Sequence, residues 1–142
     1  MNDLHNNCDA VVVIPPIALT TIAGLAGAII DRQGYGGVEF ICQYGAITAT
    51  NATITVLLKE GDVTGTLTSV ADADLLGTEV LASIPAAVRT DGVGDKVSKR
   101  IGYKGDQRYV QASISATTVT AATIVAITAV LHSPGLAPVA NP

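Results

Sequence analysis

Aromatic, histidine and cysteine side chains are scarce in this chain of 142 residues. It has no tryptophan, one phenylalanine and four tyrosines, and only two histidines and two cysteines. A glycan-binding module usually stacks sugars on exposed rings, so this inventory disfavours one without excluding it. His5 and His132 stand in opposite terminal segments, which leaves little for a histidine-dependent triad. We therefore expect that the protein is not an enzyme and has no catalytic residues.

The sequence shows no convincing ligand set for a metal or another cofactor. Cys8 and Cys42 have neither CxxC nor metal-ligand spacing. A disulfide between them and a reducing compartment both fit this scattered pair, and we favour free thiols because nothing else suggests secretion. Asp72 and Asp74 could hold a cation, but a turn cap beside a solvated neighbour explains them better. We expect no cofactor.

Charge is sparse too, and its sign excludes some partners. Only 14% of the residues are charged and the net charge is −4. Duplex DNA and anionic bilayers are poor electrostatic partners for such a chain. The apolar segment 14–30 is short for a membrane span and contains Pro15 and Pro16. We expect neither nucleic acid nor a membrane as a partner.

Apolar residues are abundant, at 49% of the chain. A chain of this length forms one domain, residues 1–142, with a substantial core. So high an apolar fraction with so little charge indicates that other chains cover much of the surface. We therefore expect a homo-oligomer.

Period-two alternation of apolar and polar residues predicts strands along most of the chain. Residues 96–115 show it most clearly, and we interpret them as a hairpin whose turn places Gly105 at positive φ. Residues 71–76 predict one helical turn, capped by Asp72 and ended by Gly77. Further strands are predicted over 11–13, 38–44, 52–60, 80–84 and 121–131. This pattern indicates an all-β fold, an antiparallel β-sandwich or a jelly roll.

Both ends of the chain are predicted to lie outside the sheets. The expected strand at 11–13 ends at Pro15-Pro16, which makes residues 1–16 an N-terminal arm. Prolines spaced along residues 133–142 predict an extended C-terminal tail. Apolar arms of this kind usually need a partner surface to lie on.

The last predicted strand, 121–131, is apolar on both faces. A strand of this kind is buried on both faces, so one face would meet the core and the other an added layer or a neighbouring subunit. The sequence leaves open which face is which. Ile124, Ala126 and Val130 share one face, and Val125, Ile127, Ala129 and Leu131 share the other.

A second candidate interface surrounds the predicted hairpin. Cations concentrate there in an acidic protein, which favours pairing with an acidic partner surface or another copy. A solvated hairpin tip explains them equally well. Tyr103 and Tyr109 flank the turn and would be suitable anchors. The predicted interface residues are Arg100, Tyr103, Lys104, Arg108, Tyr109, Val125, Ile127 and Leu131.

Several short segments together resemble a group of small structural proteins of tailed bacteriophages, over most of the chain. The group is linked to capsid genes and is similar to head decoration, or cement, proteins. These motifs are turn and strand residues, so no catalytic residue is implied. The matching positions are Ile30-Asp31, Gly34-Tyr35, Val38-Glu39-Phe40, residues 71–77, residues 100–103, Gly105, Arg108-Tyr109-Val110 and Ala137-Pro138-Val139.

The resemblance implies a virion protein on the outer surface of a capsid, made in the host cytoplasm. Its partners would be the lattice of major capsid protein and itself, with a homotrimer favoured over a dimer. A tail or head–tail connector component has the same requirements and is the nearest alternative. A glycan-binding sandwich is a more distant one.

Overall fold

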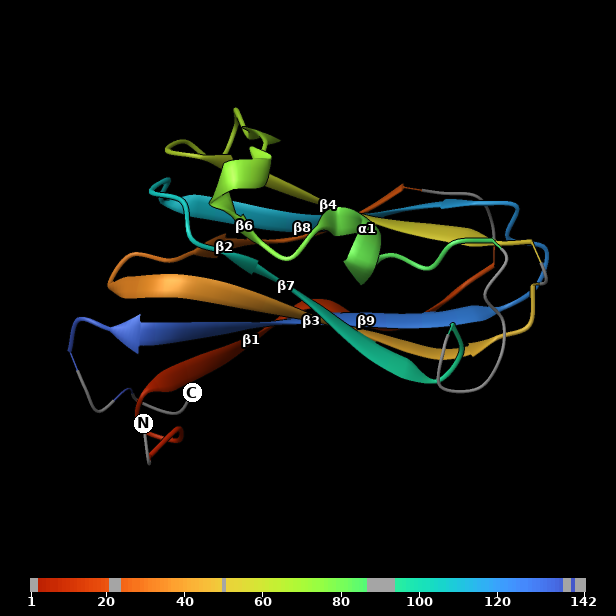
Figure 1. The fold of residues 1–142 in the computed structure, drawn as a ribbon, viewed down its shortest axis with the longest axis horizontal. Helices are drawn as coiled ribbons and strands as arrows, with labels where there is room; N and C mark the ends of the chain where they lie inside the picture. The colour runs from red at the N-terminus through yellow and green to blue at the C-terminus, as the bar shows by residue number, and fades with distance from the viewer. Residues whose placement is uncertain (1–2, 21–23, 50, 87–93, 137–138, 140–142) are drawn as a thin grey trace.

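Two antiparallel β-sheets pack face to face in the computed structural model, which describes residues 3–20, 24–49, 51–86, 94–136 and 139 (Figure 1). Sheet A consists, in order, of β1 (Cys8–Leu19), β9 (Thr123–Pro134), β3 (Tyr35–Ile47), β7 (Val97–Tyr103) and β6 (Leu75–Leu76). Sheet B consists of β2 (Gly24–Asp31), β8 (Tyr109–Thr117), β4 (Thr53–Gly61) and β5 (Thr68–Ser69). The predicted all-β antiparallel sandwich is confirmed.

The strands pair from the two ends of the chain inward. β1 pairs with β9, β2 with β8, β3 with β7 and β4 with β5. Three further pairings, β3 with β9, β4 with β8 and β6 with β7, complete the sheets. This nested order, with the chain passing back and forth between the sheets, is the jelly-roll topology.

The inward side chains of both sheets form one core. Phe40 and Ile101 from sheet A and Ile54 and Val110 from sheet B are fully buried. Burying each large aliphatic or aromatic side chain stabilises the fold by about 1.5–3 kcal/mol. β9 supplies Val125, Ile127, Ala129 and Leu131 to this core. The structure thus decides which face of the last strand meets the core.

The predicted hairpin of residues 96–115 is wrong in its pairing. Both strands exist, but β7 belongs to sheet A and β8 to sheet B, so the turn between them crosses the sandwich. Among the described glycines, Gly34 and Gly77 have positive φ, not Gly105. Gly105 is required for space instead, because a Cβ there would overlap the Tyr103 ring. Alternation reveals a strand but not its partner.

The predicted N-terminal arm is also wrong from Cys8 onward. β1 continues through Pro15 and Pro16 to Leu19 and forms an edge of sheet A against β9. Its register shifts between Val12 and Ile14 and again between Ile14 and Ile17. Prolines are tolerated at such irregularities on an edge strand because no second neighbour needs their N–H groups.

The C-terminal segment is partly tied down. β9 extends to Pro134, beyond the predicted strand end. The Val139 N–H then donates to the Asn6 carbonyl oxygen at 3.0 Å, so the described parts of the two terminal segments contact each other. Residues 137–138 and 140–142 of the predicted tail lie outside the described residues.

Two short predicted elements also differ. Residues 71–76 contain the 3-10 helix η1 (Asp72–Asp74) followed by β6, and the N-cap is Ala71 without a side-chain bond, not Asp72. Residues 80–84 are not a strand, because α1 (Glu79–Ala82) starts at the N-cap Thr78. The Thr78 hydroxyl oxygen accepts the Leu81 N–H at 3.1 Å, which stabilises this single turn.

The α1 segment closes the edge of sheet B along β4, as Figure 1 shows. A Glu79 carboxylate oxygen accepts the Leu58 N–H at 2.7 Å, and the Ser83 hydroxyl oxygen accepts the Val56 N–H at 2.9 Å. Ile54 and Ile84 exchange two backbone hydrogen bonds. An open strand edge is thereby covered by the protein's own chain. Among the described residues, no helix has the length and apolar character needed to cross a bilayer.

Candidate interaction surface

The outer surface of sheet A is the main candidate for contact with another protein. We call it the A face, formed by the outward side chains of β1, β9, β3 and β7. Strand register places Val12, Thr128, Ile41 and Arg100 side by side across the four strands. The adjacent row contains Ala10, Val130, Glu39 and Gly102.

Large apolar side chains on the A face are exposed to solvent. Val12 is 57% exposed and Ile124 is 46% exposed. The Ile124 side chain lies beside Gly45 of the neighbouring strand β3. A Cβ added at Gly45 would approach the Ile124 Cβ to 2.9 Å. The neighbouring residues Ala10, Ala126 and Thr128 are small. The A face is therefore a low-relief surface that is apolar over β1 and β9, whereas β3 and β7 also expose Gln43, Ser98 and Arg100.

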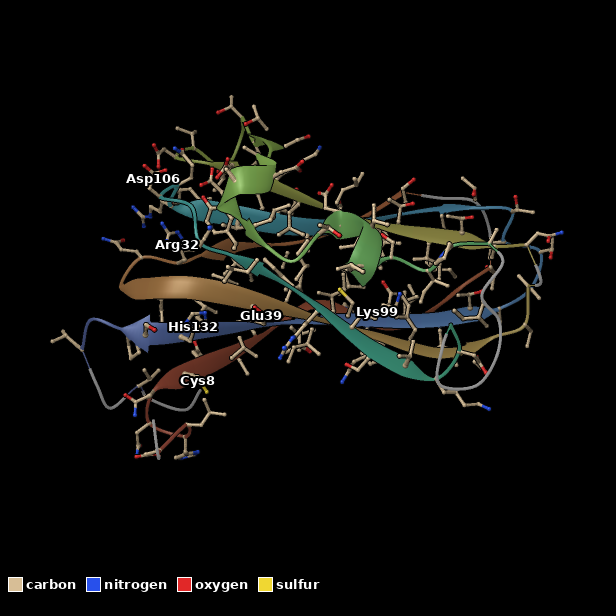
Figure 2. The ribbon with its side chains drawn as sticks, viewed as in Figure 1. Cys8, Arg32, Glu39, Lys99, Asp106 and His132 are labelled. Carbon is tan, nitrogen blue, oxygen red and sulfur yellow. The ribbon has the colours of Figure 1, made fainter. Side chains whose placement is uncertain are left out.

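Charge on the A face is limited to a local pair. The Arg100 Nε lies 3.8 Å from a Glu39 carboxylate oxygen. Burial raises the pKa of Glu39 despite the opposing effects of Arg100 and His132. Figure 2 shows Glu39 and His132 on this layer of the sandwich. A hollow of about 510 Å³ adjoins the pair and is lined by Glu39, Leu76, Gly77, Leu81 and Arg100.

The outer surface of sheet B, the B face, has a different chemistry. Its strand β8 presents Tyr109, Gln111, Ser113 and Ser115 outward. The Ser113 hydroxyl donates to the Leu57 carbonyl oxygen at 3.2 Å, and the Gln111 amide nitrogen donates to the Gly27 carbonyl oxygen at 2.8 Å. These polar groups are bound within the chain or face water.

Four of the predicted interface residues lie in the core instead. Val125, Ile127 and Leu131 are at most 2% exposed, so they cannot meet a partner in the folded chain. Tyr103 is fully buried, its hydroxyl contacts the Glu60 carboxylate, and the same oxygen accepts the Gln107 N–H at 3.1 Å. The prediction was wrong for these four because alternation does not tell which face of a strand meets the core.

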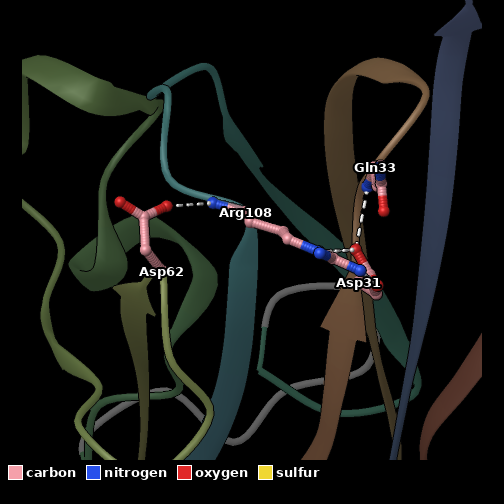
Figure 3. Close-up of polar contacts among 4 residues, drawn as sticks. All are labelled: Asp31, Gln33, Asp62 and Arg108. Carbon is pink, nitrogen blue, oxygen red and sulfur yellow. Dashed lines mark hydrogen bonds and ion pairs between the residues drawn. The ribbon is translucent and has the colours of Figure 1, made fainter.

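The cations near the sheet-crossing turn mostly have partners within the chain. Arg108 donates two hydrogen bonds to the Asp31 carboxylate, at 2.6 and 3.0 Å, and its backbone N–H donates to Asp62 (Figure 3). The hydrogen bond from Arg108 holds the pKa of Asp31 below its usual value. The Arg108 guanidinium also lies 4.9 Å from the Tyr109 ring centre. Arg100 and Lys104 are exposed, and a partner contact through them stays a prediction.

The described residues offer little for catalysis. Among them, no three His, Cys, Asp or Glu side chains gather where they could hold a metal ion. Cys8 and Cys42 are free thiols, and burial raises the pKa of Cys42 to about 12. A hollow of about 270 Å³ beside β4 is lined partly by Glu79 and Ser83, but both side chains already bind the β4 backbone.

Sequence reasoning missed the part of the A face that β1 and β3 contribute. Val12 lies within the predicted arm, and Ile41 lies between Glu39 and Gln43 on the face of the predicted strand 38–44 that reads as polar. Their cross-strand alignment with Thr128 depends on the β1–β9 and β9–β3 pairings. The apolar outward residues of β9 were the available signal.

No protein-family model matches the chain, and no curated protein matches its sequence. Among solved structures, it is similar to a chain from the "Structure of infectious bursal disease virus Gx strain", with 8% identity and a TM-score of 0.44 over 92% of this chain and 34% of that one. It is also similar to the CBM22-1–GH10 modules of Clostridium thermocellum xylanase 10B, complexed with xylohexaose, with 11% identity and a TM-score of 0.45 over 96% of this chain and 28% of that one. This chain therefore spans about a third or less of each.

Proposed function

We propose that this protein is a non-enzymatic structural protein of a phage virion, which decorates and stabilises the outer capsid surface by binding the major capsid protein. The observation that carries the proposal is the A face, a sheet surface with exposed apolar side chains, on a protein among whose described residues no group of His, Cys, Asp or Glu could hold a metal ion. Apolar surfaces of this extent mark sites of protein–protein contact. A cement protein requires contact surface both between its own copies and toward the capsid, and it requires no chemistry; the A face supplies surface for one of these contacts.

The residues that resemble phage decoration proteins support the proposal through their positions. Segments far apart in the sequence meet at one end of the sandwich: Arg108 binds Asp31, and the Lys104 N–H donates to the Asp74 carbonyl oxygen at 2.9 Å. Arg32 donates to the Gly105 and Gln107 carbonyl oxygens, each at 2.6 Å. Asp31, Asp74, Gly105 and Arg108 are matched positions, so part of the resemblance falls on residues that hold these turns together.

Of the two alternatives, glycan binding has less support, whereas a tail or connector component fits the same observations. A tail or connector component would also need an apolar contact surface, and only its place in the virion would differ. Glycan binding requires exposed rings, whereas Tyr44 and Tyr103 are buried and Tyr35 and Tyr109 are half-buried. The Tyr44 hydroxyl donates to the Ala82 carbonyl oxygen at 2.6 Å and is not available to a sugar.

Co-sedimentation with intact phage heads tests the proposal. We expect saturable binding to heads and added protrusions on their outer surface in electron micrographs. Purified tails and connectors serve as the control particles. Binding to tails or connectors alone would support the alternative, and binding to neither particle would contradict a virion role.

A further inference from the structure

We propose that the A face is covered by a second copy of this chain, so that copies associate through the outer surface of sheet A. This inference deepens the proposed function by naming a surface and a partner, and it rests on that function only for its biological setting. The association itself is a property of the free protein.

The extent of the A face suits a contact between copies. Its four main strands are 7 to 13 residues long. Strands of these lengths, ~4.8 Å apart and rising ~3.3 Å per residue, together cover ~700 Å². Stable interfaces bury about 600–1,000 Å² on each partner. The A face alone therefore reaches the lower end of this range.

The charge distribution favours a copy of the same chain as the partner. The protein carries a net charge of −4, so most approaches of one copy to another bring like charges together. At the outward positions of the A-face strands, the carboxylate of Glu39 is matched by the guanidinium of Arg100. Two copies can approach through this surface without net repulsion.

The relief of the A face suits packing against another sheet. Sheets stack about 10 Å apart when their outward side chains are compact. Ala10, Ala126 and Thr128 leave the surface low, while Val12 and Ile124 protrude from it. The hollow beside Glu39 and Arg100 gives the same surface a recess. When two copies meet through the same surface, that surface must be complementary to itself. A surface with both protrusions and a recess can meet this condition.

Association through strand edges is less favoured than association through the face. The β1 edge contains Pro15 and Pro16, which have no N–H to donate, and two register shifts. The opposite edge of sheet A, β6, has only two residues. In sheet B, α1 covers β4, and the edge strand β2 has a register shift between Ala26 and Ile29. These features favour a sheet face over a strand edge for the contact between copies.

Sedimentation velocity of matched variants tests the inference without any capsid. Ile124→Asp and Val12→Asp place a carboxylate on the A face, and Leu57→Asp places one on the B face at a residue 39% exposed. At tens of micromolar we expect an oligomer for the wild-type protein and for Leu57→Asp. We expect folded monomers for the two A-face variants, with a dissociation constant raised at least about 100-fold, because a carboxylate there would lose water without gaining a partner.

A monomeric wild-type protein would overturn the inference, as would A-face variants that associate like wild type or a Leu57→Asp variant that dissociates equally. Circular dichroism establishes that each variant is folded. If Ile124→Asp unfolds, Ile124→Thr and Val12→Asp test the inference instead: each should be a folded protein that associates more weakly than wild type and Leu57→Asp. A protein that binds heads but is a monomer contradicts only this inference, whereas an A-face oligomer that ignores heads contradicts only the proposed function.

Discussion

β8 and β9 occupy equivalent places in the two sheets, each between an edge strand and a long inner strand, yet their outward residues differ. β8 presents Tyr109, Gln111, Ser113 and Ser115 to the outside, and these polar groups face water or bind the protein's own backbone. β9 presents Ile124, Ala126, Thr128 and Val130. Folding alone requires only the inward residues of each strand. The apolar outward residues of β9 therefore indicate a contact beyond the monomer, whereas those of β8 do not.

The largest expected effect separates the two faces of β9 itself. Val125→Asp should abolish cooperative folding, because an unpaired carboxylate in the core costs more than most of a domain's stability of about 5–15 kcal/mol. Ile124→Asp, one residue away and outward, should leave the folded monomer within about 1 kcal/mol of wild type. Thermal unfolding followed by circular dichroism measures both. Equal destabilisation of the two variants would contradict the assignment of the faces.

A smaller effect tests whether the chain itself covers the edge of sheet B. Ser83→Ala removes the acceptor of the Val56 N–H and leaves that buried group unpaired. We expect a loss of about 1–3 kcal/mol in the free energy of unfolding. Urea denaturation measures it, and Ser115→Ala on the exposed B face is the control, expected within about 0.5 kcal/mol of wild type. No difference between the two variants would mean that α1 does not stabilise this edge.

The carboxylate on the A face should oppose stability at neutral pH. Burial raises the pKa of Glu39, so its ionised form costs stability above that pKa, and the cost disappears as the pH falls through it. Glu39→Gln should therefore raise the melting temperature slightly at pH 7 and leave it unchanged near pH 3. A lower melting temperature at pH 7 would show that the pairing with Arg100 outweighs burial.

The carboxylate near the B face should behave in the opposite way, with the smallest effect. Arg108 lowers the pKa of Asp31, so this ion pair adds stability above the ordinary aspartate pKa and loses it as the pH falls through the lowered value. Asp31→Asn should lower the melting temperature slightly at pH 7, because solvent screens an exposed pair, and have no effect near pH 2. An effect that persists at pH 2 would point to lost packing instead.

The sequence predicted strands better than their pairing or orientation. Alternation located β3, β4 and most of β9 because each has one regular apolar face toward the core. It could not show that β7 and β8 lie in different sheets, since pairing depends on contacts distant in sequence. Pro15 and Pro16 indicated a strand end, but an edge strand tolerates them. For the candidate surface, the sequence showed that β9 is apolar on both faces, but the predicted interface took its inward residues Val125, Ile127 and Leu131. Identifying Ile124 as outward required knowing where sheet B lies.

The concentration dependence of thermal unfolding tests the central claim, that the outward residues of β9 serve a contact between copies. A variant with Ile124→Ser and Val130→Gln gives β9 outward residues like those of β8, and Leu57→Ser is the control on the B face. Contacts between copies make the melting temperature rise with protein concentration. The account predicts such a rise for the wild-type protein and for Leu57→Ser, and a constant melting temperature for the β9 variant. A wild-type melting temperature that does not change over a hundredfold range of concentration would contradict it.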